Sequence, residues 1–115
     1  MKSEAFSGRI IKLHRYLTKE KKETTISKQL YRSGTSIGAN IAESRFAQSD
    51  ADFVSKLSIA LKEANETCYW LNCLYNAKII DDKGYNSIHD DAIEMVKILT
   101  SAIKTKKENM SAKKE

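Results

Sequence analysis

The chain has 115 residues, a length that suits one domain and one hydrophobic core. It has no proline, 4 glycines and 30% charged residues, which disfavours collagen-like, disulfide-scaffold and turn-rich β classes. Charge is segregated along the chain. Residues 9–32 carry eight basic and two acidic side chains, and residues 95–115 carry six basic and two acidic ones. Residues 43–94 between them carry five basic and ten acidic side chains. The basic regions can attract a polyanion or, equally, meet the acidic region of a second copy of the chain.

Apolar residues recur at spacings of three and four, the period of an amphipathic helix. The predicted helices cover about residues 3–19, 26–47, 50–77 and 82–106. The predicted N-caps are Thr24 or Thr25, Ser49 and Asp81. The expected core residues are Phe6, Ile10, Leu13, Leu17, Ile26, Leu30, Ile37, Ile41, Phe53, Leu57, Ala60, Ala64, Cys68, Leu71, Leu74 or Tyr75, Tyr85, Ile88, Ala92, Met95, Leu99 and Ala102.

Short connections make successive helices neighbours, so the pattern predicts an all-α, antiparallel up-down-up-down four-helix bundle. We expect the bundle to occupy residues 1–107 and a frayed or disordered basic tail to follow over residues 108–115.

The sequence predicts a cytoplasmic protein without membrane association. No window approaches the ~20 apolar residues of a membrane span, and the first residues lack the apolar stretch of an export signal. Cys68 and Cys73 point about 140° apart on a helix, which predicts reduced thiols. The chain has neither a Glu-x-x-His motif for a di-metal centre nor a phosphate-cradling glycine loop, so we expect no cofactor, no metal and no enzyme activity.

The second predicted helix carries two stripes beside its apolar face. One contains the small residues Gly34, Gly38 and Ala42, which predict a close helix contact either within the subunit or between subunits. The polar stripe consists of Gln29, Arg32, Ser36, Asn40 and Glu43, and antiparallel packing would bring Glu63 and Glu66 to Arg32. This stripe is interpreted either as a polar network that fixes helix register or as a phosphate site built on Arg32 and Asn40.

The segment from Gln29 to Ser44, QLYRSGTSIGANIAES, resembles the signature of the four-helix bundle proteins encoded in intervening sequences of bacterial 23S ribosomal RNA genes. The likeness continues in the third helix, in Asp52-Phe53, Leu57, Ile59-Ala60, Lys62-Glu63 and Asn65-Glu66-Thr67, and covers about residues 5–105. Members of that family resemble the accessory variability determinant of diversity-generating retroelements, a basic homopentamer that binds nucleic acid and a reverse transcriptase. The resemblance implies a homo-oligomer, expected to be a pentamer, with no enzymatic activity.

Charge and resemblance together favour a non-enzymatic, homo-oligomeric scaffold or accessory protein that binds RNA or DNA. The residues expected to contact phosphates are Arg9, Lys12, Arg15, Lys19, Lys21, Lys22, Lys28, Lys104, Lys106 and Lys107. The alternative is a protein-interaction adaptor whose charged faces serve oligomerisation and the docking of a partner such as a reverse transcriptase.

Overall fold

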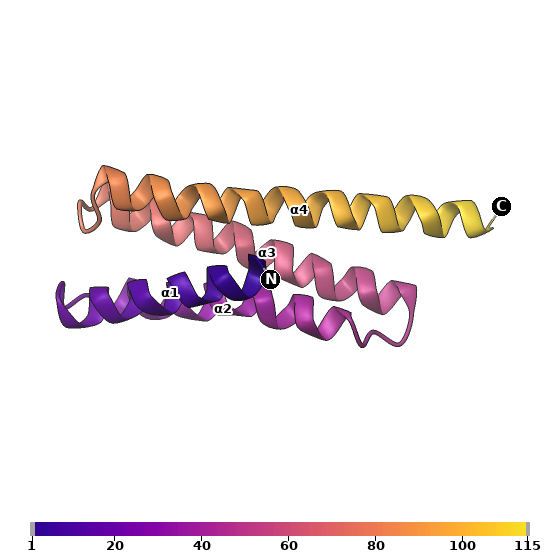
Figure 1. Ribbon diagram of the computed structural model, residues 1–115, viewed down its shortest axis with the longest axis horizontal. Helices are drawn as coiled ribbons and strands as arrows, with labels where there is room; N and C mark the ends of the chain where they lie inside the picture. Colours follow the sequence, from indigo (N-terminus) through magenta and orange to yellow (C-terminus); the bar gives the residue numbers. More distant parts are fainter. Residues whose placement is uncertain (1, 115) are drawn as a thin grey trace.

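The computed structural model describes residues 2–114, and these form four helices in an elongated bundle of 56 × 22 × 22 Å (Figure 1). The helices are α1 (Lys2–Lys19), α2 (Thr25–Ser44), α3 (Asp50–Asn76) and α4 (Asp82–Lys114). Each helix packs against the next one, and α1 also contacts α4. The predicted all-α bundle is therefore confirmed. Its first and third connections lie together at one end, the left end of Figure 1.

Side-chain caps begin α3 and α4 where the sequence predicts them. The Ser49 hydroxyl accepts a hydrogen bond from the Asp52 backbone N–H at 3.0 Å, and the Asp52 carboxylate accepts one from the Gln48 N–H at 3.2 Å. Asp81 Oδ1 accepts the Gly84 N–H at 2.7 Å. These bonds satisfy amide groups that have no partner inside the first helical turn.

The start of α2 is at the predicted position but uses a different cap. Thr24 occupies the N-cap position without a side-chain hydrogen bond. The Glu23 carboxylate takes over that role, because its two oxygens accept the N–H groups of Ile26 and Ser27 at 3.2 and 2.7 Å. A carboxylate at this end also opposes the positive pole of the helix dipole.

The core follows the predicted seam over most of the bundle. Its fully enclosed large side chains include Ile10, Leu17, Leu30, Ile37 and Leu71. Ala102 is exposed, however, so its assignment to the core was wrong. The reason is the short first helix: Lys2, at the start of α1, pairs with Glu94, and the part of α4 beyond Leu99 has no segment of α1 opposite it.

Helix α4 runs to Lys114, whereas the sequence predicted an end near Lys106 and a frayed tail from residue 108. One contact joins the extension to α3, since Asp50, which pairs with Lys106 at 2.9 Å, also pairs with Lys113 at 3.8 Å. Lysine, glutamate, alanine and methionine, which dominate this segment, are also good helix formers. Residue 115 lies outside the described residues.

The small-residue stripe of α2 makes its contact within the subunit, with α1. A Cβ atom added to Gly34 would lie 2.8 Å from both Cγ atoms of Ile10, and one added to Gly38 would lie 3.1 Å from the Ser7 hydroxyl. Glycine at position 34 thus allows the two helices to approach closely. Ala42, the third member of the stripe, is exposed.

Candidate nucleic-acid interface

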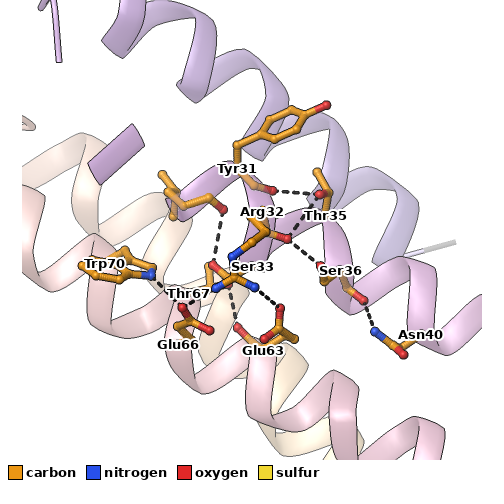
Figure 2. Close-up of polar contacts among 11 residues, drawn as sticks. Tyr31, Arg32, Ser33, Thr35, Ser36, Asn40, Glu63, Glu66, Thr67 and Trp70 are labelled. Atoms are coloured by element: carbon orange, nitrogen blue, oxygen red, sulfur yellow. Dashed lines mark hydrogen bonds and ion pairs between the residues drawn. The ribbon is translucent and has the colours of Figure 1, made fainter. Parts of the chain in front are cut away.

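Arg32 on α2 binds two carboxylates on α3 (Figure 2). Its Nη1 donates to Glu63 Oε2 at 3.1 Å, and its Nη2 donates to Glu66 Oε1 at 2.5 Å. The Trp70 indole N–H donates to the same Glu66 oxygen at 3.1 Å. The antiparallel arrangement of α2 and α3 places the Arg32 guanidinium opposite two carboxylates one helical turn apart, as predicted from the sequence.

This cluster is not suited to bind phosphate. The hydrogen bond from Arg32, with help from the Trp70 indole, holds the pKa of Glu66 below its usual range, so this carboxylate is ionised at neutral pH. One guanidinium that faces two carboxylates leaves no positive charge for an incoming anion. The alternative of a phosphate site on Arg32 and Asn40 therefore receives no support from the geometry.

The remainder of the polar stripe does not form a chain of side-chain contacts. Ser36 donates to the backbone carbonyl of Arg32 at 2.6 Å, and Asn40 donates to that of Ser36 at 2.9 Å. Within residues 2–113, Gln29 and Glu43 make no side-chain hydrogen bond to another protein group. Short polar side chains on a helix often bond to the preceding turn, which is the reason that the stripe does not connect.

The buried hydroxyls of Ser33 and Thr67, which were not predicted from the sequence, complete the contact between α2 and α3. Thr67 Oγ1 lies 3.0 Å from Ser33 Oγ and 2.8 Å from the Glu63 carbonyl oxygen. Both side chains are fully enclosed. Their hydrogen bonds offset the cost of burying polar groups, and they fix the register of the two helices.

Replacing Arg32 by alanine should lower the free energy of unfolding by about 1 kcal/mol, because the Glu63 carboxylate then remains nearly buried without its charged partner. Urea denaturation at pH 7 measures the change. Glu43→Gln, an exposed position on the same stripe, provides the control and should leave stability unchanged. Equal stability of wild type and Arg32→Ala would contradict a structural role for the cluster.

A different region concentrates uncompensated positive charge. We call residues 12–28 and 77–84 the basic end; they carry eight basic and four acidic side chains. The eight are Lys12, Arg15, Lys19, Lys21, Lys22, Lys28, Lys78 and Lys83. All eight are exposed, and none forms an ion pair within 4 Å among the side chains that the structure describes.

Three of the four acids at the basic end already have partners in the protein. Glu23 caps α2, and Asp81 caps α4. Asp82 Oδ1 accepts the hydroxyl proton of Tyr75 at 2.7 Å, and this bond raises the pKa of Tyr75. The acids are thus used to order the helix ends, and the neighbouring cations stay available to solvent or to a ligand.

The structure divides the ten predicted phosphate contacts into three groups. Six belong to the basic end. Two are engaged elsewhere: Arg9 donates to Asp91 at 2.5 Å and to Ser87, and Lys106 pairs with Asp50. The last two, Lys104 and Lys107, lie on the distal half of α4, roughly 33 and 38 Å from its start at ~1.5 Å per residue. A single contact surface therefore does not unite all ten.

Lys78 and Lys83 belong to the basic end but were missing from the predicted set. A signal was present in the sequence, because in an up-down-up-down bundle the first and third connections meet at the same end. The two connections therefore lie at one end of the bundle (Figure 1), and Lys21, Lys78 and Lys83 line the same groove although about 60 positions separate them in the chain.

The described residues, 2–114, lack two other kinds of functional feature. No helix there is both long and apolar enough to cross a bilayer. No three side chains of the kind that bind metal ions gather at one point of the described structure. Cys68 and Cys73 are both free thiols, and burial raises the pKa of Cys68.

These features define an all-α bundle protein with one strongly basic end. Residues 1–101 match the model of the 23S rRNA-intervening sequence protein family, and the chain belongs to that family. The chain is also similar to a protein of unknown function from the S23 ribosomal protein family of Bacteroides thetaiotaomicron VPI-5482, whose crystal structure is known at 1.70 Å resolution. The two are 54% identical, with a TM-score of 0.89 over 90% of this chain and 95% of the other. No curated protein matches the sequence.

Proposed function

We propose that this protein is a non-enzymatic, homo-oligomeric scaffold or accessory protein that binds RNA or DNA through its basic end. The observation that carries the proposal is the gathering of eight exposed cations, without ion-pair partners among the described side chains, from two separate loops and their flanking helices. Clustered lysine and arginine bind a polynucleotide by replacing the counterions of its phosphates.

Oligomerisation would use the half of the bundle that lies away from the basic end. Large apolar side chains are exposed there: Phe46 at 86%, Ile59 at 42% and Ile98 at 41%. The same half contains the part of α4 that α1 does not reach. Apolar exposure of this kind supports subunit contacts, and the pentameric number follows from the family resemblance.

Direct binding and size measurements test the proposal. Fluorescence anisotropy with labelled 20-nucleotide RNA and DNA, single-stranded and duplex, should show binding at 50 mM salt. Light scattering on the same sample should give a defined oligomer larger than the 13.0 kDa chain. Absence of binding to every polynucleotide at 50 mM salt would reject the nucleic-acid role, and a defined oligomer without binding would support the adaptor alternative.

A further inference from the structure

A groove with a volume of about 1220 Å³ opens at the basic end, between the second half of α1 and the link from α3 to α4. The two ion pairs that join α1 to α4, Lys2–Glu94 and Arg9–Asp91, both involve the first half of α1. The second half of α1 borders the groove through Lys12, Leu13 and Tyr16. The volume of the groove exceeds the roughly 300–1,000 Å³ of most small-molecule sites, so the groove suits an extended ligand better.

The groove combines an apolar surface with basic side chains. Leu13, Tyr16, Ile79 and Ile88 are among its apolar lining residues. Tyr16 is 46% exposed, so its ring is accessible to a ligand. The Lys21 ammonium lies 6.0 Å from the centroid of that ring, which places positive charge beside an aromatic surface.

The charge of the groove favours an anionic ligand. Four lysines line it without an ion pair among the described side chains: Lys12, Lys21, Lys78 and Lys83. The two acids in its lining, Asp81 and Asp82, are occupied by the Gly84 N–H and the Tyr75 hydroxyl. An occupant with both negative charge and flat apolar groups would complement this surface.

The backbone at Lys78 gives independent support for a functional lysine. Lys78 has a φ of 61°, in the left-handed region where glycine is the usual residue after a helix. Lys22, in the other loop of the basic end, has a φ of 54°, and these two are the positive-φ non-glycine residues of the described chain. At both positions lysine accepts backbone strain that glycine would avoid, and each lysine adds a cation to the basic end.

We infer that the groove binds a segment of single-stranded polynucleotide, an inference that rests on the proposed function and assigns its site. The lysines would bind phosphates, and an unstacked base would lie against the Tyr16 ring. A duplex keeps its bases stacked inside, so it can offer only phosphates to the lysines. The mixed apolar and basic lining therefore selects single strands over duplexes.

The test compares the affinity of the full-length protein for labelled oligo(dT) and oligo(U) of 12 nucleotides with that for a 12-base-pair duplex at 100 mM salt. Both single strands should bind at least about 10-fold more tightly than the duplex. Tyr16→Ala should weaken single-strand binding roughly 5- to 150-fold, the range for loss of one stacked base, and leave duplex binding unchanged. Tyr69→Ala, an exposed tyrosine outside the groove, is the matched control and should change neither affinity.

The variant Lys78→Gly distinguishes a binding defect caused by the lost charge from one caused by misfolding. Glycine relieves the strained backbone, so the melting temperature should rise. Loss of one phosphate contact should at the same time lower single-strand affinity about 5-fold at 100 mM salt. A variant that is more stable but binds less tightly cannot owe its defect to misfolding.

Three outcomes would overturn the inference. If single strands and the duplex bind equally, and Tyr16→Ala and Lys78→Gly bind like wild type, the groove is not the site, although the proposed function stands. If no polynucleotide binds, the proposed function fails together with the inference. If instead a labelled poly-glutamate peptide binds with the same dependence on Tyr16, the groove is assigned to an acidic protein partner.

Discussion

Neutralising four lysines of the basic end should reduce polynucleotide affinity by about 10²- to 10³-fold at 0.1 M salt. The variant carries glutamine at Lys12, Lys19, Lys21 and Lys28, all of which are exposed and without an ion pair among the described side chains. Each phosphate contact with a single strand contributes a slope of about 0.7 to the dependence of log affinity on log salt. Four lost contacts should therefore reduce that slope by about 3, which a salt titration followed by fluorescence anisotropy measures directly.

A variant with the same change in net charge shows whether the position of the charge matters. It carries glutamine at Lys62, Lys97, Lys104 and Lys107, four exposed lysines outside the basic end. Its affinity should fall only a few-fold, because the long-range field of the protein is screened over about 10 Å at 0.1 M salt. Equal losses in the two variants would mean that binding depends on net charge alone, and the localised interface would have to be abandoned.

Much of the fold could be predicted from the sequence because its signals are local. The helix period, the Ser49 and Asp81 caps and the short connections lie within a few residues of the elements that they determine. The incorrect end of α4 has a different origin. Its last turns are held by Asp50, a residue more than 50 positions earlier in the chain, and no local pattern reports such a contact.

The candidate site was less predictable because a charge count does not show which charges are paired. Arg9 and Lys106 look like the other basic residues in the sequence, yet both have acidic partners on another helix. Lys78 was overlooked for the opposite reason, since it stands alone in an apolar link and joins the basic residues of the first loop only in the folded bundle. Which basic side chains are free to bind a ligand is thus decided by the packing of the helices.

Gly34→Ala should destabilise the bundle by about 2 kcal/mol, although alanine is the better helix former by about 1 kcal/mol. The new methyl group would meet both Cγ atoms of Ile10 at 2.8 Å, and Ile10 is fully enclosed and branched at Cβ, so it cannot move aside. Forcing an extra carbon into a packed core costs about 1–3 kcal/mol, and a closed contact between two helices lies at the upper end of that range.

The matched control for this clash is a second glycine-to-alanine variant, at Gly38, four residues further along the same face of α2. Gly38→Ala would bring its Cβ to 3.1 Å from the Ser7 hydroxyl, a group that can rotate away. The gain in helix propensity should then dominate, and stability should stay constant or rise by up to about 1 kcal/mol. Urea denaturation of both variants decides the issue. A Gly34→Ala protein as stable as Gly38→Ala would show that α1 and α2 can separate without loss, so that the small residues are not required for their close approach.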